Sequence, residues 1–211
     1  MNKNKKQFFL KAVFVAGAIL GATNAFADRD GDHDDVIDTG IVEPCQYLPL
    51  VNNPTNSTVC VDVPVNLLKA KVVFNMDHDA KDASGTPIGM KHMIMLSTGL
   101  KARIAAGLVN PNDVSIIGVF HGSAASWVLS NEWWNNKNNN TEGNPYANLL
   151  NQLLAFKDLG VNVQLEECGV TMNGNHWTND DLFPGIHVNQ GAIGRLIALE
   201  QQKYSYIQPG K

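Results

Sequence analysis

The sequence contains few cysteines, no basic stripe and, beyond its first residues, no long apolar run. Three cysteines in 211 residues exclude a fold held together by many disulfides. Lys and Arg total 16 against 20 Asp and Glu, and no basic run is present to neutralise phosphates, so nucleic acid is not an expected partner. No run after the first residues approaches the roughly 18 residues of a membrane span.

The amino-terminal segment has the three parts of a secretory signal peptide. Lysines at positions 3, 5 and 6 precede an apolar run over 8–22, and residues 25–27 (Ala-Phe-Ala) have the small-x-small pattern of a cleavage site. We expect cleavage after Ala27 and a periplasmic or secreted protein with no stable membrane anchor. An uncleaved anchor over residues 1–27 is the alternative.

Residues 28–66 are expected to form an acidic leader that contains a disulfide arm. Six aspartates lie within 28–38, offset by one arginine, a composition typical of a solvated segment. Cys45 and Cys60 flank a turn-rich stretch, and a bridge between them would stabilise it by roughly 3 kcal/mol in an oxidising compartment. Two alternatives remain open, namely that both thiols are unpaired or that one of them pairs with Cys168.

From residue 67 to residue 211, short apolar runs alternate with segments of helical periodicity. Alternation of this kind is typical of an α/β domain, so we expect a three-layer sandwich whose mostly parallel sheet of four to five strands is covered by helices on both faces. Strands are predicted over 71–76, 114–120, 161–166 and 185–189, helices over 88–108, 123–134, 145–159 and 191–202, a polar loop over 135–144, and a short closing segment over 204–207.

Cys168 is the leading candidate for a functional residue. It comes at the end of the third predicted strand, and open α/β sheets place their chemistry at that edge. A helical turn beginning at Gly169 would supply N–H groups that lower the thiol pKa. Strand alternation puts Glu166 on the face of Cys168 and Glu167 on the other, so Glu166 is the more serious obstacle to a thiolate. The alternative is an inert, buried cysteine.

His121 is the second catalytic candidate. It follows the second strand as Cys168 follows the third, so both side chains reach the same edge if these strands are neighbours. A purely structural role, capping the turn, is the alternative. The candidate binding positions at that edge are Gly122, Gly169 and Asn189.

Metal binding is the least supported interpretation of the polar residues. Asp77, His78, His121, Cys168 and His187 are in principle ligands, but no two of them have the spacing of a metal site. Asp77 and His78 are more simply a polar loop after the first strand. We therefore expect no metal and no cofactor.

The order of these segments resembles the DsrE/DsrF-like (YchN-like) proteins, from Lys71 to Pro209. This resemblance implies a compact α/β sandwich. Some members carry sulfur as a cysteine persulfide in sulfur oxidation or transfer-RNA thiolation, as cytosolic homo- or hetero-oligomers, and many secreted members have no assigned activity. The signal peptide, acidic leader and disulfide arm depart from the sulfur carriers and put transfer-RNA work in doubt. The residues that carry the resemblance are His121-Gly122, Asn144-Pro145, Gly160-Val161, Cys168-Gly169, the stretch 181–185 (Asp-Leu-Phe-Pro-Gly) and the stretch 204–209 (Tyr-Ser-Tyr-Ile-Gln-Pro).

Two functions follow as hypotheses. The first is a periplasmic sulfur or persulfide carrier, or thiol relay, in which Cys168 exchanges sulfur with a donor or acceptor protein; if active, it is sulfurtransferase-like. The second is a non-catalytic oligomeric binding or scaffold module in which Cys168 is structural. The resemblance implies a homotrimer or homohexamer, and Trp133 or Trp134 is a candidate interface anchor, with ordinary helix packing as the alternative.

Overall fold

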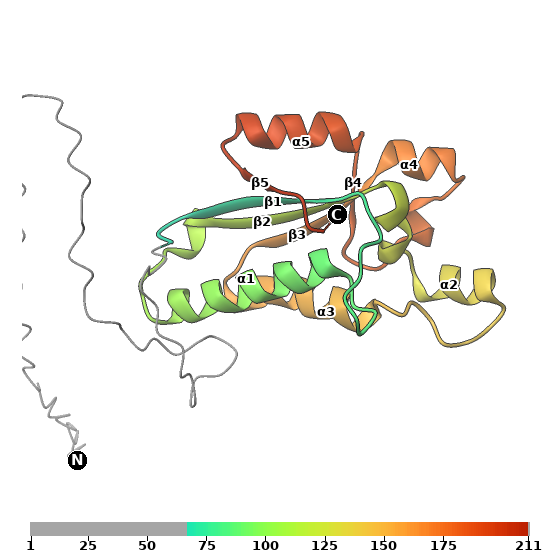
Figure 1. Ribbon diagram of the computed structural model, residues 1–211, viewed down its shortest axis with the longest axis horizontal. Coiled ribbons are helices and arrows are strands. Elements are labelled where there is room, and N and C mark those ends of the chain that lie inside the picture. Colours follow the sequence, from blue (N-terminus) through green and yellow to red (C-terminus); the bar gives the residue numbers. More distant parts are fainter. Residues whose placement is uncertain (1–66, 211) are drawn as a thin grey trace, which may run out of the picture. The chain divides into compact units, whose positions relative to one another are not determined.

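The computed structural model describes residues 67–210, which form one α/β unit (Figure 1). The predicted signal peptide, the acidic leader and the pairing of Cys45 with Cys60 lie outside these residues, and the division at residue 67 stays a prediction. Within the described range no helix combines the length and the apolarity needed to cross a membrane.

Five strands form a single sheet in which every neighbouring pair is parallel. Their spatial order is β4-β3-β2-β1-β5, so the last strand lies beside the first. The expected parallel sheet is therefore confirmed, and the carboxyl ends of all five strands share one edge. The strands are β1 (Ala70–Met76), β2 (Val114–Phe120), β3 (Val163–Cys168), β4 (His187–Asn189) and β5 (Ser205–Ile207).

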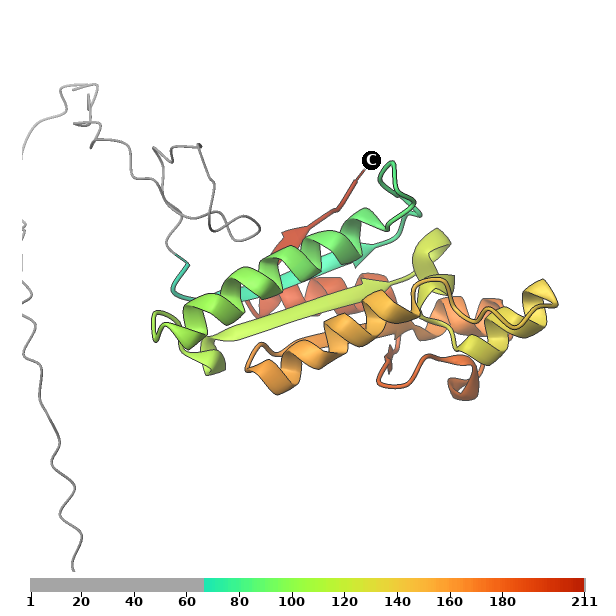
Figure 2. The same ribbon diagram turned by 90° about the horizontal axis from the view of Figure 1, so that it is seen from below.

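Helices cover both faces of the sheet, as expected (Figures 1 and 2). Helices α1 (Ile88–Ala105) and α3 (Ala147–Ala155) lie on one face, and α5 (Ala192–Gln201) lies on the other. Alternate residues of each strand serve the two layers: Phe74 packs in the α1–α3 core, whereas Val73 packs in the core under α5. A short helix, α4 (Gly169–Gly174), follows β3 directly and confirms the predicted turn at Gly169.

The segment after β2 differs from the predicted helix over 123–134. A 3₁₀ helix spans Gly122–Val128, and a separate helix, α2, spans Asn131–Asn138. The chain breaks there because the Ser130 hydroxyl accepts the backbone N–H of Trp133 at 3.1 Å and caps α2. The predicted polar loop therefore starts at Asn139, whose left-handed backbone ends the helix.

The tryptophans after β2 pack together beside α4. Trp133 stacks edge-on with both Trp134 and Trp177, at ring-centroid distances of 5.6 and 5.5 Å. They lie against a small apolar cluster that includes Leu129 and Met172, so each is partly buried. Ordinary packing accounts for their position, and a role as interface anchors stays a prediction.

The strand register brings the candidate site together. Strand β3 ends two residues later than predicted, so Cys168 is its last residue and pairs with Asn189 of β4. On the other side Phe120 pairs with Glu167, and His121 follows Phe120 directly. The two candidates therefore lie at the carboxyl ends of neighbouring strands.

Candidate functional site

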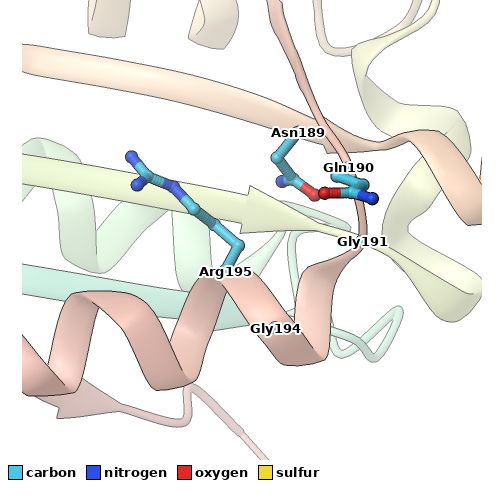
Figure 3. Close-up of a pocket in the computed structure, with 5 residues that line it drawn as sticks. All are labelled: Asn189, Gln190, Gly191, Gly194 and Arg195. Atoms are coloured by element: carbon cyan, nitrogen blue, oxygen red, sulfur yellow. The ribbon is translucent and has the colours of Figure 1, made fainter.

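Cys168 and His121 line the same pocket at the carboxyl edge of the sheet. Its volume is about 370 Å³. A second hollow of about 400 Å³ adjoins it and shares Gly191 and Gly194 (Figure 3). The remaining lining of the first pocket is Val170, Thr171, Ala192 and Ile193, and that of the second is Asn189, Gln190 and Arg195.

The Cys168 sulfur lies where the amino termini of α4 and α5 meet. Its Sγ accepts the backbone N–H of Ala192, the first residue of α5, at 3.2 Å. From α4, Thr171 and Val170 lie near enough to the sulfur for their polar groups to lower its pKa. Helix amino termini carry unsatisfied N–H groups and partial positive charge, which favour an anion. The fold therefore surrounds this sulfur with donors.

Two effects on the Cys168 pKa oppose each other. The side chain is only 4% exposed, and burial alone raises the pKa of this thiol. The hydrogen bonds from Thr171, Ala192 and Val170 act in the other direction, and together they bring the pKa below its ordinary value. The site thus eases formation of the thiolate, which is the nucleophilic form.

Glycine at position 169 lets α4 begin immediately after Cys168. A Cβ atom there would lie 2.8 Å from the backbone oxygen of Asn189, closer than van der Waals contact allows. Gly122 is similarly constrained, because it has φ +58° and a Cβ would lie 2.7 Å from the Asp77 carbonyl oxygen. Both glycines therefore shape the edge of the sheet, and their predicted role in ligand binding stays a prediction.

The expected obstacle from Glu166 is removed by an ion pair. Arg195 of α5 donates to it from Nη2 at 2.6 Å and from Nε at 2.8 Å. The Glu166 side chain is 3% exposed and also accepts the amides of Gln164 and Asn189. Its charge is compensated within the fold, so Glu166 is not an unpaired carboxylate on the face of Cys168.

Glu167 is the unusual carboxyl group of this edge. It is fully buried on the opposite face of β3, as predicted, and neither of its side-chain oxygens has a hydrogen-bond partner. Burial raises the pKa of Glu167 to about 9. At neutral pH it is therefore a neutral acid, and it places no negative charge beside the thiolate.

His121 lies between β1 and β3 at the same edge. Its Nε2 is 2.6 Å from the side-chain oxygen of Asn75, the penultimate residue of β1. Burial lowers the pKa of His121 against an opposing effect of Asp77, with a smaller lowering effect of His78. The imidazole is thus neutral at neutral pH, which leaves one ring nitrogen able to accept a proton.

The remaining polar candidates do not assemble into a metal centre. Asn189 lines the second hollow, and its amide nitrogen is 3.3 Å from Glu166. His187 is exposed on β4, whereas Asp77 and His78 contact each other after β1. Among residues 67–210 no three potential ligands lie together.

Several residues of the site were not predicted from the sequence. Thr171 and Ala192 supply donors to Cys168, Arg195 compensates Glu166, and Asn75 holds His121. Thr171 and Ala192 stand at the starts of two helices near the sheet edge, a position that could have suggested them. Asn75 and Arg195 act across 46 and 29 residues of sequence, and no local pattern marks such contacts.

Comparisons with known proteins identify a family, and the similar solved structures include a distant neighbour. The model of the DsrE/DsrF-like family matches residues 72–209. A solved protein of unknown function from Methanobacterium thermoautotrophicum aligns with a TM-score of 0.44 at 17% identity, covering 67% of this chain and all of that one. A search of curated proteins finds no match to this sequence.

Proposed function

This chain belongs to the DsrE/DsrF-like family, and from that premise we propose that it is a periplasmic sulfur carrier in which Cys168 holds the sulfur as a persulfide. The family match suggests sulfur relay only at the level of the family. The cysteine, its mechanism and the compartment belong to our proposal, and the amino-terminal signal pattern supports the compartment.

The proposed reaction is the transfer of one sulfane sulfur between thiols. The Cys168 thiolate attacks the terminal sulfur of a donor persulfide, R–S–SH. A bond forms between Sγ and that sulfur, the donor S–S bond breaks, and R–S⁻ leaves. An acceptor thiolate then attacks the terminal sulfur of the Cys168 persulfide and releases the Cys168 thiolate. No external oxidant or reductant is needed.

The proposal rests on the position of the Cys168 sulfur, which accepts the Ala192 N–H at the start of α5, has its pKa lowered by Thr171 of α4, and lines a pocket. Such groups would stabilise an inert core cysteine little, because a neutral thiol is a weak acceptor. The same groups stabilise the negative charge of the Cys168 thiolate after its sulfur has passed to the acceptor. The 370 Å³ pocket leaves room for the added sulfur atom.

Sulfur uptake tests this function. Purified protein is exposed to inorganic polysulfide, and the mass of the peptide that contains Cys168 is measured against a Cys168→Ser variant. We expect the gain of sulfur to require Cys168. Absence of a gain, or an equal gain by the variant, refutes the carrier function.

A second candidate function is an oligomeric binding module with a structural Cys168. The near-complete burial of this side chain favours it, as do the apolar side chains Val170 and Ile193, which are 67% and 74% exposed beside the pocket. A second copy of the chain seated there would cover them. Slow alkylation of Cys168 in the folded protein across neutral pH, together with a stable oligomer by light scattering, favours this function.

A further inference from the structure

A chain of hydrogen bonds runs across the carboxyl edge of the sheet from β5 to His121. Gln208, just after β5, donates its Nε2 to the side chain of Asp77. Its Oε1 accepts both the Tyr206 hydroxyl, at 2.6 Å, and Asn75 Nδ2, at 2.9 Å. Asn75 Nδ2 also lies 2.8 Å from the Tyr206 oxygen, and Asn75 Oδ1 faces His121 Nε2 at 2.6 Å.

The direction of each bond in this chain follows from the carboxylate at its start. An ionised Asp77 only accepts, so Gln208 must present its NH₂ group to it and its oxygen to Asn75. That oxygen accepts, so Asn75 must present its NH₂ group to Gln208 and its oxygen to His121. An amide oxygen accepts, so His121 Nε2 must carry a hydrogen. If the side-chain amide of Asn75 or Gln208 were flipped, an acceptor would face an acceptor or a donor would face a donor.

We propose that Asn75, Gln208 and Asp77 are positioning residues that hold His121 in its Nε2–H tautomer and so make Nδ1 the proton acceptor of the site. The inference rests on the proposed function only where it assigns that nitrogen to Cys168. There, the Cys168 thiol loses its proton and Nδ1 gains it, which gives a thiolate and an imidazolium without any change in electron count. Cys168 and His121 line one pocket, so the two side chains face the same cavity.

Burial and His78 lower the pKa of His121 and so oppose the imidazolium, whereas Asp77 stabilises it. Asp77 and His78 approach it from the loop after β1, and Cys168 lies beside it at the end of β3. The Asp77 carboxylate is shared with Gln208 and His78, and its charge also raises the pKa of His121 directly. Asn75 itself is 6% exposed, which shields its bond to His121 from competing water.

The tautomer is measured directly by long-range ¹H–¹⁵N correlation spectroscopy on the full-length protein labelled at histidine nitrogen, at neutral pH and without any sulfur donor. The His121 signals are assigned as those missing in His121→Gln. We expect Nε2 at the shift of a protonated ring nitrogen and Nδ1 at that of an unprotonated one. The Nδ1–H pattern, or averaged shifts from exchange between tautomers, overturns the proposal.

A matched pair of variants tests the origin of the tautomer. Gln208→Met removes the link from Asp77 to Asn75, whereas Gln202→Met makes the same chemical change at an exposed position outside the chain. We expect the two His121 nitrogen shifts to move toward each other in Gln208→Met and to stay apart in Gln202→Met. Unchanged shifts in Gln208→Met contradict the role of Gln208 and Asp77. The measurement uses no sulfur, so its failure is distinct from a failure of sulfur uptake.

Discussion

Arg195 holds Glu166 in a two-pronged ion pair, with Nη2 2.6 Å from Oε1 and Nε 2.8 Å from Oε2. This pair joins α5 to β3 two residues before Cys168. The same helix places its first N–H group against the Cys168 sulfur. The position of α5 therefore controls both the charge near the thiol and a donor to it.

Arg195→Met is expected to destabilise the fold and to raise the pKa of the Cys168 thiol, because it leaves a buried Glu166 carboxylate without its partner. Loss of one member of a buried pair costs about 3 kcal/mol. Urea unfolding and the pH dependence of Cys168 alkylation measure the two effects. The double variant Glu166→Gln/Arg195→Met should recover most of both, and no recovery would contradict the assigned role of the pair.

Thr171→Val is expected to slow alkylation of Cys168 below the thiol pKa by roughly tenfold, because a lost hydrogen bond to a charged sulfur is equivalent to about 1.4 kcal/mol. Thr171→Ser keeps the hydroxyl and should react at nearly the wild-type rate. Alkylation followed by mass spectrometry of the Cys168 peptide, from pH 5 to pH 10, gives both pKa values. Equal pH profiles for Thr171→Val and Thr171→Ser would show that the hydroxyl does not affect the pKa of Cys168.

The raised pKa of Glu167 predicts that the stability of the fold decreases as pH rises. Its folded-state pKa of about 9 lies above the ordinary value of 4.5, so the folded chain keeps a proton that the unfolded chain loses. Between these two values the free energy of unfolding therefore falls as pH rises, by about 1.4 kcal/mol per pH unit from this group. The loss ends above the folded-state pKa.

Glu167→Gln is expected to remove that slope. Its free energy of unfolding should be close to that of wild type near pH 5 and higher by a few kcal/mol at pH 8, by the same linkage. Urea unfolding at both pH values measures this. Glu200→Gln, at an exposed site on α5, is the matched control and should keep the wild-type slope. A Glu167→Gln variant with the wild-type slope would show that this carboxyl is ionised in the fold.

Gly169→Ala is expected to destabilise the protein by about 1–3 kcal/mol, because its Cβ would meet the Asn189 backbone oxygen at 2.8 Å. To relieve this contact α4 must move, which should also separate α4 from Cys168 and slow the alkylation of Cys168 at neutral pH. Gly174→Ala, in the same helix, meets nothing within 4 Å and should be neutral or slightly stabilising. Equal effects of the two substitutions would contradict the packing described here.

The sequence predicts the layers of the fold better than the contacts of the site. Apolar runs and helical periodicity locate the strands because burial dictates them locally, and Gly160 and Gly169 mark a helix end and a helix start. The helix over 123–134 was wrong because a single cap, Ser130, outweighs periodicity there. The pairing of β5 with β1 joins residues 133 positions apart in the sequence, such as Val72 and Ser205, and no local pattern records it.

The site shows the same limit at the level of single side chains. Alternation correctly placed Glu166 and Cys168 on one face, but charge compensation came from Arg195, one helix away. The strand pattern could likewise place Glu167 on the opposite face. Only the packed structure shows that its oxygens have no partner and that it is consequently neutral.

Peptide-level mass spectrometry after exposure to polysulfide shows whether Cys168 carries sulfur. Full-length wild type, Cys168→Ser and a Cys45→Ser/Cys60→Ser variant are treated alike, digested and mapped before and after reduction. We expect a gain of sulfur on the Cys168 peptide in wild type and in the double variant. A thiol reductant should remove this gain, and Cys168→Ser should lack it. A Cys168 peptide of unchanged mass in the folded wild-type protein would contradict it.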